Sequence, residues 1–161
     1  MSIGQNSCGK NIGGIRSIEL IPPEALFRAD YYAATDEYDF VELAEGFEPT
    51  PLHFSEGSGR WVEKTEDGTG RVVHRVECEL RGVQPSAIRR LERLCLNGVV
   101  ALVATENGEE YVVGYSPEAQ ADYPLRLTEV ISDSSKVRSK EAATLLVFSS
   151  TDGWFSRPIA Q

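Results

Sequence analysis

The run of residues closest to a chemical motif is Gly-Gln-Asn-Ser-Cys-Gly-Lys-Asn, at residues 4–11. A phosphate-binding loop ends in lysine followed by a serine or threonine that holds magnesium, and it joins a buried strand to a helix. Here Asn11 occupies the last place, no strand precedes the run, and two glycines and a strand-like segment follow it. We therefore expect no nucleotide binding, and we interpret residues 1–14 as a flexible N-terminal arm.

The residues that could bind a metal ion or act as nucleophiles are dispersed along the chain. Neither HExxH nor CxxC occurs, no serine, histidine and acid are grouped, and the histidines and cysteines stand singly, at His53, His74, Cys8, Cys78 and Cys95. A metal site needs ligands clustered at short spacing, so none is predicted. The cysteines are interpreted as small hydrophobic residues and not as a disulfide framework. The sequence thus predicts no cofactor, no metal and no catalytic residue.

Charge is distributed unevenly over the 161 residues, whose formal net charge is −9. Residues 24–57 carry nine acidic side chains against Arg28 alone: Glu24, Asp30, Asp36, Glu37, Asp39, Glu42, Glu45, Glu48 and Glu56. Such a surface repels phosphate backbones, which argues against nucleic-acid binding. There is no apolar run of about 18 residues and no secretion signal, so we expect a protein made in the cytoplasm without a membrane segment.

The best-defined elements lie in the middle of the chain. Alternating apolar and polar residues over 72–80 predict a half-buried strand. From residue 85 to 96 the apolar residues recur at spacings of three and four, which predicts a helix that begins at Pro85 and ends at Asn97 and Gly98.

A strongly apolar segment follows the predicted helix. Residues 99–105 are apolar on both faces, so we expect a central strand covered by the helix or by another chain. Asn107 and Gly108 then predict a two-residue hairpin turn, with residues 111–115 returning antiparallel.

The remaining pattern predicts a mainly β chain. Further strands are expected at residues 15–21, 38–43, 52–54, 60–66, 125–131 and 142–149, with hairpins joining 52–54 to 60–66 and 60–66 to 72–80. Residues 24–50 are expected to form a long acidic loop. The predicted fold is a single domain over residues 15–161, an antiparallel β-sandwich or barrel with one flanking α-helix at about 85–96.

The order of elements from Val72 onward, with its ENGEEYVVGY turn and its PLRLTEVISDSSKV segment, resembles small structural proteins of tailed-phage and prophage tail modules. The early CGKNIGGIRSIELIP segment is similar to the start of such proteins, whereas residues 24–50 have no counterpart. The resemblance implies a tail-tube or tail-completion subunit, a β-sandwich whose copies form rings, with a hexamer as one option. It implies other tail proteins as partners, no catalytic residues, and a place in the virion tail.

Two other classes of function stay open beside a phage-tail protein. One is a monomeric sandwich or barrel that binds a small ligand or a protein partner through Tyr31, Tyr32, Tyr38 and Trp61. The other is an enzyme whose site is assembled from residues distant in sequence. For the tail hypothesis, the expected assembly interface comprises Tyr31, Tyr32, Asp36, Glu37, Asp39, Asn107 and Gly108.

Overall fold

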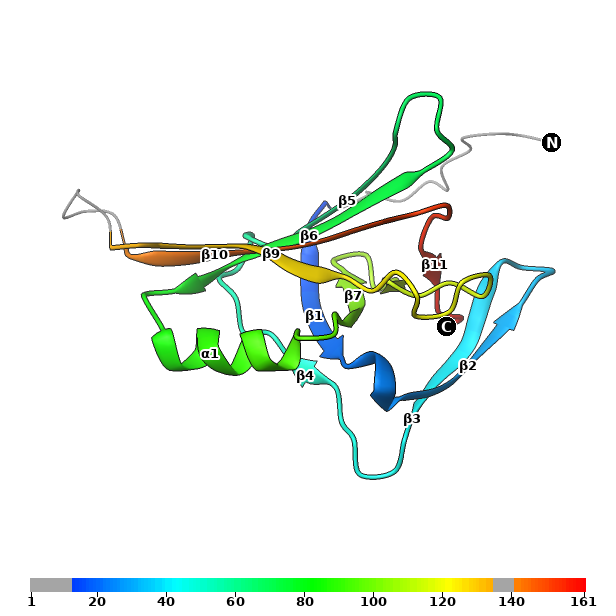
Figure 1. The fold of residues 1–161 in the computed structure, drawn as a ribbon, viewed down its shortest axis with the longest axis horizontal. Helices are drawn as coiled ribbons and strands as arrows, with labels where there is room; N and C mark the ends of the chain where they lie inside the picture. Colours follow the sequence, from blue (N-terminus) through cyan, green and yellow to red (C-terminus); the bar gives the residue numbers. More distant parts are fainter. Residues whose placement is uncertain (1–12, 135–140) are drawn as a thin grey trace.

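Three antiparallel sheets and one flanking helix form the fold in the computed structural model, which describes residues 13–134 and 141–161 (Figure 1). The expected mainly β class is confirmed, and the architecture is a sandwich of open sheets. Of the N-terminal arm expected at residues 1–14, residues 1–12 lie outside the described part of the chain, as does the whole of the Gly-Lys run at 4–11.

One layer is a five-stranded sheet with the order β11-β8-β7-β1-β4. Its strands are β1 (Ile15–Ile21), β4 (Thr50–Pro51), β7 (Val100–Thr105), β8 (Glu110–Val113) and β11 (Arg157–Pro158). The opposing layer is a four-stranded sheet with the order β5-β6-β10-β9, formed by β5 (Arg60–Thr65), β6 (Val72–Arg81), β9 (Arg126–Asp133) and β10 (Ala143–Asp152). A third sheet is the hairpin of β2 (Leu26–Tyr32) and β3 (Glu37–Leu43), entered through a 3₁₀ turn, η1 (Pro23–Ala25).

The main core lies between the two larger sheets. Inward residues of β6 and β10, such as Val76 and Phe148, meet Ile18 of β1 and Val103 of β7, and all four are fully buried. The period of two in β6 is seen directly, because buried and more exposed residues alternate along its ten positions. The sequence pattern therefore identified the inner face of this strand correctly.

A second core covers the other face of the five-stranded sheet. Val100 of β7 and Val112 of β8 point away from the main core and pack with Tyr38 of the β2–β3 hairpin, which is fully buried. The double-sided burial expected for residues 99–105 is thus real. The hairpin covers this second face, whereas the helix, one of the two covers expected from the sequence, packs on the main-core face of β7.

The helix α1 (Pro85–Leu94) begins at Pro85, as predicted, and stops two residues short of the expected end. Leu91 is buried, and so is Cys95 just beyond the helix. Gly98 has a positive φ of 82°, and a Cβ there would lie 2.5 Å from the Pro124 side chain. Glycine is required at this position for its conformation and for its small size.

Two expectations about local structure are wrong. Residues 24–50, expected as a long loop, contain the β2–β3 hairpin; only the strand at 38–43 had been foreseen. Residues 52–54 do not form a hairpin with β5, because the adjacent strand β4 pairs with β1 instead. Short strands with few alternating residues leave the choice of partner to long-range packing. The hairpins β5–β6 and β7–β8 are confirmed.

The orientation of α1 can be tested with two substitutions one position apart. Leu91→Asp should place an unpaired charge in the main core and lower stability by several kcal/mol, on the order of the cost of burying an unpaired charge. Arg90→Ala should cost less than about 0.5 kcal/mol, because Arg90 is exposed. Thermal melts of both variants provide the measurement, and equal midpoints would contradict the packing of the helix.

Candidate functional site

The acidic hairpin β2–β3 is attached to the body of the protein through Arg157 of β11. The Arg157 Nε donates to Asp36 Oδ1 at 2.6 Å, and its two terminal nitrogens donate to the Glu118 carboxylate at 2.9 and 2.7 Å. The guanidinium also lies over the Tyr31 ring, 5.1 Å from its centre. One side chain therefore joins the turn of the hairpin, the 116–120 loop and the C-terminal strand.

Asp36 occupies the turn of the hairpin with a positive φ of 56°, a conformation that aspartate tolerates better than most residues. Its carboxylate also accepts a hydrogen bond from the Tyr31 hydroxyl at 2.6 Å. The bonds from Tyr31 and Arg157 lower the pKa of Asp36, and the bond to Asp36 raises the pKa of Tyr31. Tyr31 and Asp36, both expected at an assembly interface, are thus linked to each other within one molecule.

The C-terminal segment also links the hairpin to the turn at Asn107 and Gly108. Ile159 forms a bridge with Tyr38 and donates its N–H to the carbonyl of Glu110, and Gln161 Nε2 donates to the Gly108 carbonyl at 2.6 Å. The two parts of the expected interface are therefore connected through the last residues of the chain. The sequence offered no sign of this connection, since these tail residues carry no recognisable pattern.

The outer face of the hairpin exposes aromatic and acidic side chains together. Phe27, Tyr32 and Phe40 are 71%, 58% and 40% exposed. Asp39 is also exposed and Glu37 is partly exposed, so three of the expected interface residues, Tyr32, Glu37 and Asp39, lie at this surface. The interface expected from the sequence did not include Phe27 or Phe40, although both stand among acidic residues.

The aromatic surface suggested for a ligand-binding module is not formed. Tyr38 is fully buried in the second core, whereas Trp61 packs against Tyr111 on the main-core side, with ring centres 4.6 Å apart. The five-stranded sheet lies between these two rings, since they belong to the cores on its opposite faces. This correction follows from topology, which places β3 and β5 in different layers.

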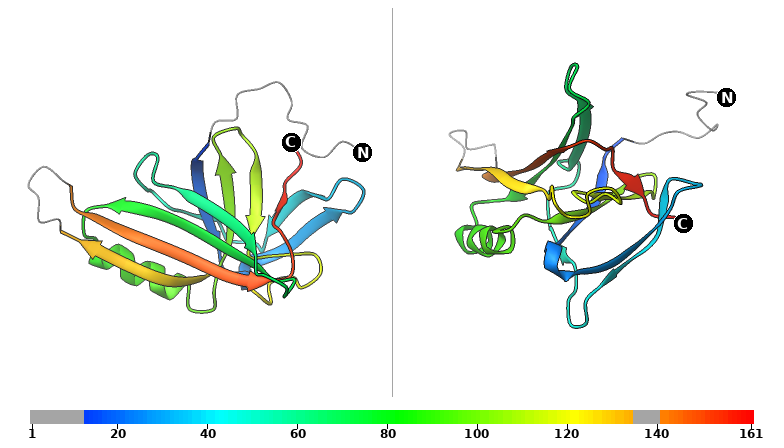
Figure 2. Two further views of the ribbon diagram at one scale, coloured as in Figure 1. Left: turned by 90° about the horizontal axis from the view of Figure 1, so that it is seen from above. Right: turned by 45° about the vertical axis from the view of Figure 1, so that its right-hand side comes forward.

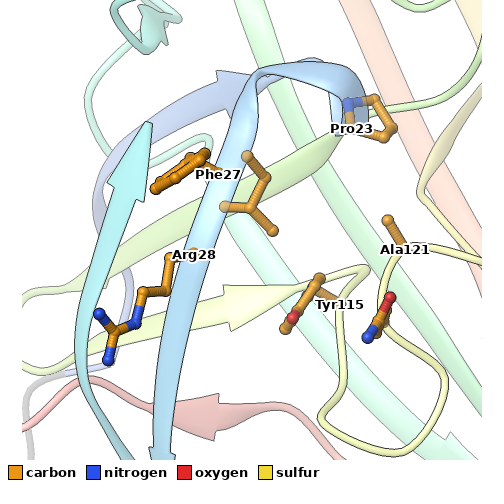
Figure 3. Close-up of a pocket in the computed structure, with 7 residues that line it drawn as sticks. Pro23, Phe27, Arg28, Tyr115 and Ala121 are labelled. Carbon is orange, nitrogen blue, oxygen red and sulfur yellow. The ribbon is translucent and has the colours of Figure 1, made fainter. Parts of the chain in front are cut away.

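A small pocket of about 200 Å³ lies at the base of the hairpin. Figure 3 shows Pro23, Phe27 and Arg28 on the side of β2, with Tyr115 and Ala121 on the facing loop. Its volume is below the range of about 300–1,000 Å³ that is usual for small-molecule sites. The volume of this pocket therefore gives no reason to identify it as a ligand site.

A larger groove of about 500 Å³ runs between α1 and β4. Its walls are mainly apolar, and Arg90, Gln84 and His53 contribute polar atoms; the apolar lining comes from Pro51, Leu52, Leu80, Ala87, Leu91 and Leu94. The groove exists because β4 pairs with β1 and so passes beside the helix. Sequence analysis did not find it, since its two walls are about thirty residues apart in the chain.

Glu63, His74 and Asp152 form a buried ionisable cluster. His74 is 1% exposed, and its Nδ1 and Nε2 lie 2.7 and 2.8 Å from the Glu63 and Asp152 carboxylates. Glu63 also accepts the backbone N–H of Ser156 at 3.0 Å, and Asp152 accepts that of Trp154 at 2.9 Å. The cluster fastens the start of the C-terminal segment to the four-stranded sheet.

The geometry of this cluster suits a structural role and not catalysis by a base. Burial acts to lower the pKa of His74, but hydrogen bonds from its ring to Glu63 and Asp152 outweigh burial and raise the pKa. With both ring nitrogens facing carboxylates, neither is free to take a proton from Ser150, its cross-strand neighbour in β10. The sequence showed no sign of the cluster, because its three residues stand apart in the chain and are brought together by the pairing of β5, β6 and β10.

Other chemical features of the described residues are few. Burial raises the pKa of Cys78 to about 12 and that of Cys95 to about 11, so both thiols stay protonated and unreactive near neutral pH. Within residues 13–134 and 141–161, no group of histidine, cysteine and acidic side chains is arranged to hold a metal ion. In the same residues, no helix has the length and apolar character needed to cross a membrane.

Comparisons of the chain with family models, with curated proteins and with solved structures found no match.

The role of Asp36 can be separated from that of its neighbour Glu37 by a matched pair of variants. Asp36→Asn removes one charge and weakens the bonds to Tyr31 and Arg157, so it should lower stability by up to about 1 kcal/mol, the range for an exposed ion pair. Glu37→Gln removes the same charge without losing an ion pair seen in the described residues, so its midpoint should not move. A smaller shift for Asp36→Asn than for Glu37→Gln in thermal melts would contradict this arrangement.

The pH dependence of stability should report the charge of His74. Its pKa is raised in the folded state above the ordinary value of 6.5, so its contribution is complete below that pH and is lost as pH rises through the folded pKa. The melting temperature should therefore fall as pH rises above about 6.5, the ordinary pKa from which that of His74 is raised. His74→Gln should flatten this dependence and cost about 3–5 kcal/mol below pH 6.5, because two buried carboxylates lose their cation. A variant with the wild-type pH profile would contradict the assignment.

Proposed function

We propose that this protein is a virion structural protein, a tail-tube-like subunit that assembles into rings stacked as a DNA-conducting tube. It is made in the host cytoplasm and carried in the tail of the virion. Its partners in this role are further copies of itself, with a hexameric ring as one option, and other tail proteins. No catalytic group is part of the proposal.

The observation that carries the proposal is the outer face of the β2–β3 hairpin. Three aromatic side chains, Phe27, Tyr32 and Phe40, are exposed there on one small two-stranded sheet. Clustered exposed apolar groups on a protein surface mark sites of contact with another protein or a ligand. The same hairpin is fastened through Arg157 and Tyr38, so its outer face is presented in a defined orientation.

The charge of the chain supports the same proposal. A tube through which DNA moves benefits from walls that do not retain phosphate groups, and a net charge of −9 gives long-range repulsion. The sandwich itself supplies a rigid body, since two cores hold the five-stranded sheet from both sides. Rings built from such bodies need contact surfaces that lie outside the cores.

A second candidate is a monomeric binding module for a small ligand or a protein partner. The groove between α1 and β4 favours it, because about 500 Å³ falls within the usual size range of ligand sites. In this function the binding site for the ligand is the groove, and not the aromatic surface that was expected from the sequence.

Mass measurement in solution distinguishes the two functions. As the protein concentration increases, sedimentation velocity should show rings or polymers, and negative-stain electron microscopy should show annular particles or tubes. Assembly should weaken as salt increases from about 0.1 M to about 1 M, because screening shortens the reach of exposed charges from about 10 Å to about 3 Å. A strict monomer at every concentration and salt would contradict the tail-tube proposal.

A further inference from the structure

We propose that the outer face of the β2–β3 hairpin of one copy seats in the groove between α1 and β4 of the next copy. The inference rests on the proposed assembly and names the two surfaces that make it. The occupant of the groove is thus a second copy of this chain, which presents phenyl rings and carboxylates.

The groove offers an apolar floor with a cationic edge. Leu52, Leu80 and Leu94 contribute apolar lining, and Arg90 lines the same groove from the helix. Ala87 is small, which leaves room between the helix and β4. Such a site suits a flat apolar group with a neighbouring negative charge.

Positive charge gathers on the helix beside this groove. Helix α1 carries Arg89, Arg90 and Arg93 against the single acid Glu92, and all four are exposed. Within the described residues, none of the three arginines forms an ion pair. In a chain with a net charge of −9, this helix is a local cationic surface available to an anionic partner.

The hairpin carries the complementary groups. Residues 26–48 hold seven acidic side chains against Arg28, and that arginine is already bound to Asp30 at 2.7 Å. Phe40 and Glu42 are both exposed and stand two residues apart on β3, so they share its outer face. Glu42 faces Arg28 across the hairpin, and the exposed Phe27 precedes that arginine in β2. This face therefore combines phenyl rings with the Glu42 carboxylate, which forms no ion pair within the described residues.

The two surfaces lie on opposite sides of the molecule. Helix α1 and the hairpin are at opposite ends of the view in Figure 1, and the right-hand view of Figure 2 also separates them. A molecule therefore cannot bring its own hairpin to its own groove. A contact between unlike surfaces of identical copies is head-to-tail, and it closes into a ring or continues as a filament.

The contact can be tested with variants that each disable one surface. Phe27→Ser combined with Phe40→Ser disables the hairpin and leaves the groove intact. Arg90→Glu reverses the charge of the groove, and Ala87→Trp fills it as a second, independent change. Ile131→Ser and Arg126→Glu are matched controls, since both residues are exposed on β9 and neither lines the groove nor belongs to the hairpin. Thermal melts confirm that each variant is folded.

We expect each disabling variant to require at least about tenfold more protein for half-maximal assembly, because aromatic and arginine anchors carry most of the energy of an interface. The two controls should assemble as the wild type does. Combining Arg90→Glu with Glu42→Arg should restore assembly, since the charges are exchanged between the surfaces.

Mixing a hairpin variant with a groove variant gives the decisive measurement. The hairpin variant keeps an intact groove, and the groove variant keeps an intact hairpin. In native mass spectrometry the two proteins should therefore form a 1:1 dimer that grows no further. If the wild type forms rings and the disabling variants form the same rings, this contact is overturned and the proposed function stands. A mixture of the two variants that stays monomeric, beside a wild type that forms rings, has the same consequence. A wild type that is always monomeric would overturn both proposals.

Decanoate tests whether the groove is a site for a small anion. A decanoate-induced rise in the melting temperature that Arg90→Glu abolishes, together with unchanged assembly of that variant, would overturn the contact.

Discussion

The fold depends on covering both faces of the five-stranded sheet. In β7, Ala101 and Val103 face the main core, while Val100 is buried on the opposite side. The four-stranded sheet and α1 cover the first face, and the β2–β3 hairpin covers the second, with Tyr38 as its largest buried side chain. The acidic hairpin therefore has two roles, because its inner face completes the second core and its outer face meets solvent.

The C-terminal segment holds these layers together through charged groups at two depths. At the inner level, Glu63 and Asp152 hold the buried His74 and accept the backbone N–H groups of Ser156 and Trp154. At the outer level, Arg157 binds Asp36 in the turn of the hairpin. The inner cluster is screened little by salt because it is buried, whereas the outer bonds reach an aspartate that is 65% exposed. The contribution of the outer bonds is thus more sensitive to ionic strength than that of the inner cluster.

Charge is separated along the molecule. The hairpin end is strongly acidic, and the arginines of α1 lie at the other end (Figure 1). A body with unlike ends favours head-to-tail association over two-fold pairing, since like charges would meet in a symmetric contact of either end. This asymmetry connects the proposed ring assembly to the proposed contact between hairpin and groove.

Sequence alone determined the local structure: the alternation in β6, the apolar spacing in α1, the turn at Asn107 and Gly108, and the mainly β class. Each of these depends on neighbours within a few residues, which periodicity and turn chemistry record. Tertiary structure alone decided that β4 pairs with β1, that residues 24–50 cover a sheet, and that His74 lies between Glu63 and Asp152. These contacts join residues from distant parts of the chain, and their partners are chosen by burial and charge compensation in three dimensions.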